Sequence, residues 1–166
     1  MDKKNILLVL SCVFLSVGIT GCVAMSPAKP PLPAVINIIP PSPDLPPEIA
    51  AFSGVWEGKW GAVQDTVIVI EKIDAKTAEV LISFGEAERT GIRPQNIYHY
   101  QTAAVLPGPI IQWKISNRDS RDDCPCTVTL KLNKELNRLT AFFTFERIKS
   151  KWRADLTRST TEKVLQ

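Results

Sequence analysis

The sequence predicts an all-β domain over residues 49–166, folded as an eight-stranded antiparallel up-and-down barrel. Three observations lead to this fold class. Apolar and polar residues alternate with a period of two in successive segments of this stretch, as in strands with one buried face, and no helical period occurs. The connections are short and polar or contain Gly and Pro, which favours antiparallel neighbours. Strands with one wet face need a second sheet or closure to remove their open edges, and an up-and-down barrel provides closure.

The chain begins with the features of a secretory signal peptide. Lys3 and Lys4 precede an apolar run over residues 6–19, and small residues follow the run. A single transmembrane anchor starting near Asn5 is the alternative, but the run is short for a hydrocarbon core that needs about 20 apolar residues. We therefore expect residues 1–21 to be a signal peptide that is removed on export.

The end of this run resembles a bacterial lipobox, with the residues Ile19-Thr20-Gly21-Cys22. The resemblance implies that Cys22 becomes the first residue of the mature protein and carries acyl chains such as palmitate. Two or more chains hold a protein stably on a membrane, whereas one holds it only reversibly. Val23 stands where Asp would be a retention signal, which in a diderm bacterium implies sorting to the outer membrane. The implied location is the cell envelope, facing the periplasm if the source is diderm.

Residues 22–48 form a predicted tether between the lipidated Cys22 and the barrel. Nine prolines lie between residues 26 and 48, and they remove backbone donors and fix φ, so we expect neither a helix nor a central strand there. We expect an extended polyproline II spacer of about 3.1 Å per residue, or roughly 70–80 Å when fully stretched. Ile36, Ile38 and Ile39 are unusual in a spacer, and they leave open a docking role toward a proline-reading partner or the cell wall.

Alternation assigns the faces of the predicted strands. Trp56 and Trp60 share the inner face of the first strand, and Trp113 lies with its apolar neighbours on the inner face of the fifth. The second strand is apolar on both faces over residues 67–70 and is expected to be covered or central. The predicted strands span residues 54–60, 66–72, 78–84, 97–105, 110–116, 127–132, 139–147 and 152–157.

The opening strand carries a second resemblance. Residues 52–60 read Phe-Ser-Gly-Val-Trp-Glu-Gly-Lys-Trp and resemble the first strand of calycin-type barrels, which include lipocalins and avidin-like proteins and open with Gly-x-Trp. The resemblance implies that Trp56 closes one end of the barrel. It also implies that an Arg from the last strand packs across this Trp in a cation–π contact, and Arg158 has the required inward parity. The loops are shorter than in lipocalins, and no second lipocalin motif is evident.

The inner aromatic residues are the candidates for a binding site. A barrel of eight strands holds either its own side chains or one small ligand. Trp56, Trp60, Trp113 and Arg158 are therefore candidate ligand-binding residues, and a plain structural role in the core is the alternative for each tryptophan.

Cysteine and histidine give little indication of chemistry. Cys12 leaves with the signal peptide and Cys22 is lipidated, so Cys124 and Cys126 are the pair available for a disulfide in an oxidising compartment. Copper or zinc would need further soft ligands, and the only histidine is His99. We predict no metal and no cofactor. Because no nucleophile motif, paired carboxylate, phosphate loop or metalloprotease signature occurs, we also predict that the protein is not an enzyme.

The charge balance limits the class of partner. Without residues 1–21 the chain has 18 basic and 16 acidic residues, a net charge of +2, which does not indicate a nucleic-acid partner. The predicted function is a membrane-anchored, non-enzymatic binding module for an unknown small ligand or envelope protein. One alternative is a protein-interaction or hydrolase-inhibitor lipoprotein that inserts residues 85–96 or the cysteine loop into its target. A weaker alternative is a redox or metal-handling protein that uses Cys124 and Cys126.

Overall fold

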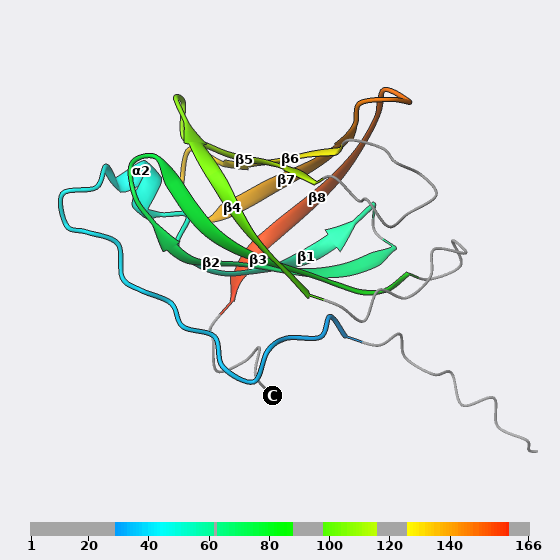
Figure 1. Ribbon diagram of the computed structural model, residues 1–166, viewed down its shortest axis with the longest axis horizontal. Coiled ribbons are helices and arrows are strands. Elements are labelled where there is room, and N and C mark those ends of the chain that lie inside the picture. The colour runs from blue at the N-terminus through cyan, green and yellow to red at the C-terminus, as the bar shows by residue number, and fades with distance from the viewer. Residues whose placement is uncertain (1–28, 62, 88–97, 116–125, 160–166) are drawn as a thin grey trace, which may run out of the picture.

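The computed structural model describes residues 29–61, 63–87, 98–115 and 126–159, and it confirms the predicted fold class. Eight antiparallel strands follow one another around a closed barrel in chain order, and β8 returns to pair with β1 (Figure 1). Each strand overlaps a predicted one and ends within three residues of the predicted limits. The elements are α2 (Pro47–Ala50), β1 (Gly54–Trp60), β2 (Gln64–Ile73), β3 (Thr77–Ala87), β4 (Tyr98–Leu106), β5 (Ile110–Ile115), β6 (Cys126–Leu132), β7 (Arg138–Phe145) and β8 (Ser150–Ser159).

The core lies inside the barrel and is formed by the side chains that alternation assigned to the inner faces. Because the strand period is two, every second residue of each strand contributes, and the polar residues between them face outward. Among the buried members are Phe52, Trp56, Trp60, Ile68, Ile70, Val80, Ile82, Ile111, Trp113, Val128, Leu130, Leu139 and Leu156.

The seam between β1 and β8 closes the barrel, and it depends on a glycine. Gly58 pairs with Leu156 in the register of the two strands. A Cβ atom added at Gly58 would overlap the backbone carbonyl oxygen of Asp155. The two backbones can therefore approach this closely only because residue 58 has no side chain.

One end of the barrel is covered by the chain that precedes β1, and we call it the closed end. It holds the starts of β1, β3, β5 and β7. Leu45, Ile49 and Phe52 pack against the core there. Part of this cover is the short helix α2, although the prediction excluded a helix up to residue 48. The prediction was wrong at Pro47 because proline is tolerated in the first turn, where its missing N–H would have no helical partner.

The proline-rich segment does not stand free of the barrel from residue 29 onward, which differs from the predicted spacer. Leu32, Ile36 and Ile38 pack on the outer apolar cluster of Val55, Val67, Val69 and Leu81. Hydrogen bonds fix the segment along its length, from the Ser83 hydroxyl to the Pro31 carbonyl and from the Ile39 N–H to the Glu71 carbonyl at 2.7 Å. We call residues 29–39 the strap. It covers the outer apolar face of β2, the strand predicted to need cover.

β4 and β5 pair only near the closed end. Their register runs over three pairs, from Ala104↔Gln112 to Leu106↔Ile110, although β4 has nine residues. The two strands therefore separate toward the other end of the barrel, beyond Ala104 on β4 and Gln112 on β5. The signal peptide, Cys22, Cys124 and the interior of the predicted inserting segment lie outside the described residues. The described segments include no helix long and apolar enough to cross a membrane.

The seam gives a first prediction. Gly58→Ala is expected to destabilise the protein by about 3 kcal/mol, because β1 and β8 must move apart to accept the methyl group. Gly61→Ala is the matched control, since a Cβ there meets nothing within 4 Å. Gly61→Ala should lower the free energy of unfolding by only about 1 kcal/mol, because the added side chain stands on a residue with positive φ. Urea unfolding followed by circular dichroism measures both, and equal losses would contradict a close seam.

Candidate ligand-binding site

The closed end brings together two of the predicted residues, Trp56 and Arg158. The guanidinium carbon of Arg158 lies 4.5 Å from the centroid of the Trp56 ring, which confirms the predicted cation–π contact. Arg158 also donates hydrogen bonds to the carbonyl oxygens of Ser53, at 2.7 Å, and of Ala51. Partial burial lowers the pKa of Arg158 by desolvation, but an arginine keeps its charge in proteins.

The polar groups of this pair bind the protein itself. The indole Nε1–H of Trp56 donates to the Phe52 carbonyl at 2.8 Å, and the side chain is fully buried. The indole donor of Trp56 and two N–H groups of Arg158 are therefore bound by the segment before β1. The geometry supports a structural role for Trp56 and Arg158, which join the first strand, the last strand and the cover of the closed end.

Trp60 and Trp113 resemble Trp56 in burial but differ from it in the pairing of the indole N–H. Both face the interior, and their exposed fractions are only 1% and 4%. Neither indole N–H has a hydrogen-bond partner among the residues that the structure describes. A buried donor without a partner costs about 1–3 kcal/mol, so these two donors are candidates for hydrogen bonds to a ligand.

Aromatic rings continue from Trp60 toward the end opposite α2. The Trp60 ring centroid lies 6.4 Å from that of Phe84 and 6.0 Å from that of Phe143. Phe145 lies 4.9 Å from Phe143 and 5.6 Å from Trp152. We call Trp60, Phe84, Trp113, Phe143, Phe145 and Trp152 the aromatic cluster.

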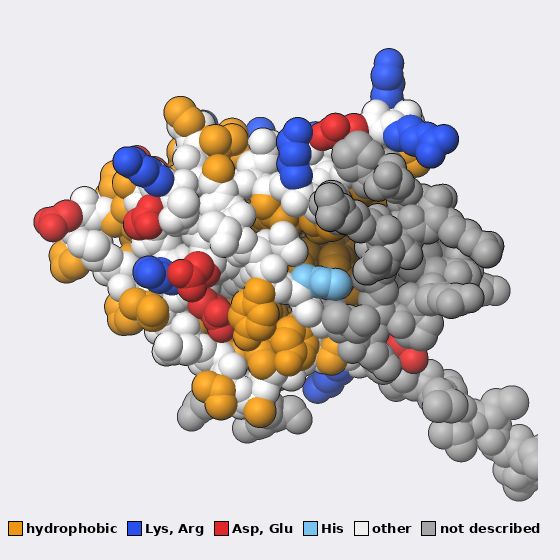
Figure 2. Space-filling view, in the orientation of Figure 1, with side chains coloured by type: hydrophobic (Ala, Val, Ile, Leu, Met, Phe, Trp, Pro, Cys, Tyr) orange, Lys and Arg blue, Asp and Glu red, His pale blue; other side chains and the backbone are white. Residues whose placement is uncertain are grey.

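This end of the barrel is open to solvent, and we call it the open end. Phe84, Phe143 and Phe145 have inward parity but are only half-buried, and Trp152 keeps 38% of its surface exposed. His99 pairs with the inward-facing Ile82, yet it is exposed because β5 has separated from β4 at this level. Figure 2 shows a hollow beside the pale blue histidine with hydrophobic side chains inside it. Among the described inward residues, Phe52, Trp56 and Leu139 at the closed end are thus fully buried, whereas the phenylalanines at the open end keep part of their surface exposed.

Phe84, Phe143, Phe145 and Trp152 were not among the predicted site residues. The alternation of their strands places them on the inner face, which the register supports, but inward parity alone does not distinguish a site residue from a core residue. Their position at the ends of strands next to turns was the available signal, because inward side chains at a strand end lie near the mouth of a barrel.

The other candidate residues do not form a reactive site in the described part of the chain. Cys126 is buried at the start of β6, while Cys124 is outside the described residues, so the disulfide stays a prediction. Within ranges 29–61, 63–87, 98–115 and 126–159, no three His, Cys, Asp or Glu side chains are placed to hold a metal ion.

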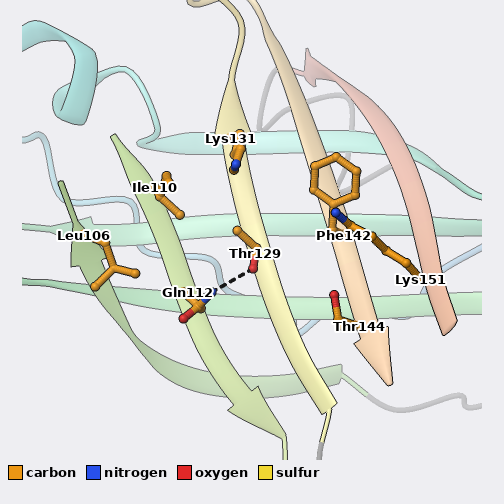
Figure 3. A pocket seen from close by; sticks show the side chains of 8 residues that line it. All are labelled: Leu106, Ile110, Gln112, Thr129, Lys131, Phe142, Thr144 and Lys151. Carbon is orange, nitrogen blue, oxygen red and sulfur yellow. Dashed lines mark hydrogen bonds between the residues drawn. The ribbon is translucent and has the colours of Figure 1, made fainter. Parts of the chain in front are cut away.

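A second concavity lies on the outer face, over β5 to β8. It is a groove of about 230 Å³ whose walls include Leu106, Ile110 and Phe142 (Figure 3). Lys151 Nζ lies 3.9 Å from the centroid of the Phe142 ring, and Lys131 also lines the groove. Gln112, Thr129 and Thr144 are also in the lining and no acidic residue is, so the groove is basic and only partly apolar.

Comparisons of this chain with protein-family models, with curated proteins and with solved structures found no match.

The contrast between the tryptophans gives a second prediction. Trp56→Phe should destabilise the protein by about 3 kcal/mol, because it removes a made hydrogen bond and weakens the contact with Arg158. Trp113→Phe should cost less than about 1 kcal/mol, because the loss of packing is offset by removal of an unpartnered buried donor. Chemical denaturation of both variants tests this order. A larger loss for Trp113→Phe would mean that its N–H is satisfied within the fold.

Proposed function

We propose that this protein is a membrane-anchored, non-enzymatic binding protein that takes one small ligand into the open end of its barrel. The observation that supports the proposal most directly is the pair of buried, unpartnered indole N–H groups of Trp60 and Trp113. Both lie among apolar side chains that face the same interior. A ligand that completes these hydrogen bonds would remove the cost of leaving the donors unpaired.

The chemistry of the cluster indicates the class of ligand. Rings of Phe and Trp offer apolar surface and favour flat or hydrocarbon groups. The two indole groups can only donate, so the ligand must supply a hydrogen-bond acceptor. None of the cluster side chains carries a formal charge, and an unpaired charge is costly to bury. The proposed ligand is therefore a neutral apolar molecule with an acceptor oxygen such as a ketone or ester.

The anchor is the second part of the proposal. It rests on the lipobox resemblance of residues 19–22, which implies acyl chains on Cys22 and a place in the cell envelope. A binding protein held at a membrane meets its ligand at the surface rather than in bulk solution. The proposed localisation is the outer membrane, facing the periplasm, if the source is diderm.

The ligand class is tested with two compounds of the same shape. In isothermal titration calorimetry, 2-acetylnaphthalene should bind saturably and about tenfold more tightly than 2-isopropylnaphthalene, which lacks the acceptor and leaves the donors unpaired. The protein used starts at Val23, so it keeps the strap and carries no lipid. Trp113→Phe should remove the difference between the two compounds.

The isopropyl compound also controls for simple apolar partitioning, because its affinity should be the same in the variant and in the parent protein. Equal affinities of the two compounds in the parent protein would contradict a role of the indole donors. Absence of saturable binding by either compound would contradict the open end as a small-molecule site.

A protein partner is the second candidate function, and the outer groove is the observation that favours it. Lys131 and Lys151 lie beside apolar walls there without an acidic neighbour in the lining. A partner segment with a carboxylate next to an apolar side chain would complement this surface.

The groove can be tested by charge reversal. An envelope protein that the parent chain enriches in a pull-down should no longer be enriched by the double variant Lys131→Glu/Lys151→Glu, because the variant groove repels the carboxylate of the partner. Lys134→Glu is the matched control, since Lys134 is exposed in the turn after β6, outside the groove. Enrichment that survives the double reversal would exclude the groove as the partner site.

A further inference from the structure

We propose that the open end of the barrel is a membrane-docking surface, which rests against an anionic lipid bilayer and so places the mouth of the barrel at the lipid phase. The inference deepens the proposed function, because it assumes the lipid on Cys22 and adds the orientation of the barrel. Two independent features of the described residues lead to it.

The first feature is where the strap begins. Lys29 and Pro30 lie against the outer face of β1 and β2, beside Lys59 and Asp65. Lys59 is the last residue but one of β1 and Asp65 is the second residue of β2, so both are next to the β1–β2 turn. From there the strap runs toward the closed end, where Ile39 bonds to Glu71. The chain therefore leaves the barrel near its open end. In Figure 1 the blue start of the strap lies well away from α2, which marks the closed end.

The length of the remaining tether limits how far this end can lie from the membrane. Residues 22–28 are seven in number, and seven residues span at most about 25 Å. The full proline-rich segment would have reached much further if residues 29–39 were unattached. The bilayer surface is thus within a short distance of the open end, whatever path residues 22–28 take.

The second feature is the composition of the open end itself. Among the described residues, five of the seven large exposed hydrophobic side chains lie in this half of the barrel, at positions 63, 98, 100, 148 and 152. Ile148 is 67% exposed at the tip of the β7–β8 turn, and Val63 is 37% exposed beside the β1–β2 turn. Apolar tips with Trp and Tyr nearby are typical of residues that enter a membrane interface.

Basic residues surround the most exposed of these tips. Arg147, Lys149 and Lys151 flank Ile148 and are all exposed, and Figure 2 shows blue side chains gathered over this turn. The nearby Glu146 accepts a hydrogen bond from Thr127 at 2.8 Å and lies 3.9 Å from Lys114, so its charge is partly compensated. Each basic residue near an anionic bilayer strengthens binding by about fivefold. We call Val63, Arg147, Ile148, Lys149, Lys151 and Trp152 the docking rim.

The orientation is tested on the lipidated full-length protein, reconstituted in vesicles of phosphatidylcholine and phosphatidylglycerol that contain a spin-labelled headgroup lipid. A fluorophore is attached through a non-natural amino acid at position 149, on the rim, or at position 134, in the turn at the closed end. Both positions are exposed lysines, so each label removes the same charge. Because spin-label quenching requires near contact, the label at 149 should be quenched at least about threefold more than the label at 134.

Two variants separate docking from tethering. Ile148→Asp combined with Lys151→Glu should remove most of the difference between the two labels, since it opposes both apolar insertion and charge attraction. Val35→Asp is the matched control, because Val35 is 76% exposed on the strap and away from the rim. It should leave the difference unchanged.

The outcomes distinguish the parts of the proposal. Mass spectrometry first determines whether Cys22 carries lipid, and its absence would overturn both the anchor and the docking inference. With lipid present, equal quenching at the two positions, stronger quenching at 134, or insensitivity to the rim variant would overturn the docking inference alone. The calorimetric test of ligand binding is independent of either result.

Discussion

The pairing of β8 with β1 is the constraint on which the rest of the structure depends. Without it, eight strands would leave two open edges and an exposed apolar face. Gly58 permits the close approach of the two backbones, and Arg158, which pairs with Trp56 near the end of the seam, extends the contact through its side chain. By bonding to Ala51 and Ser53 and packing on Trp56, Arg158 fixes the segment that enters the barrel to the strand that ends it. Trp56 and Arg158 thus find their partners within the fold at the closed end, whereas the buried Ser159 hydroxyl at the same end has none among the described residues.

The three buried tryptophans of the barrel differ in how their indole donors are paired. A core selected for stability alone pairs its buried donors or lacks them, because an unpaired one costs free energy. Trp56 follows this rule and Trp60 and Trp113 do not, although all three are buried in one barrel. Local departures from such rules concentrate at functional sites, where a ligand completes what the fold leaves open. The same half of the barrel is where β4 separates from β5 and inward phenylalanines keep exposed surface.

Much of the fold could be predicted from the sequence, and the features that could not be predicted have a physical explanation. A period of two assigns each residue to a face, so the strands, the inner tryptophans and the parity of Arg158 could all be predicted. Hydrogen-bond satisfaction depends on which groups meet across the barrel, so nothing local distinguishes Trp56 from Trp113. The separation of β4 and β5 is likewise a property of the closed sheet rather than of either strand. Pro47 shows the limit of composition, since proline excludes a helix interior but not a first turn.

The strap shows how one segment can meet two requirements. The apolar outer face of β2, with Val67 and Val69, would be exposed in a bare barrel, and Leu32, Ile36 and Ile38 cover it. The prolines around them limit the conformations of the unbound segment, which reduces the entropy lost when it binds. The same attachment shortens the tether from a reach of roughly 70–80 Å for the whole proline-rich stretch to about 25 Å. With the proposed lipid on Cys22, burial of an apolar face would thus also set the distance and the direction in which the barrel lies from the membrane. A segment selected only as a spacer would not need alternating apolar residues at 36 and 38, whereas one selected to hold the barrel in a fixed orientation would.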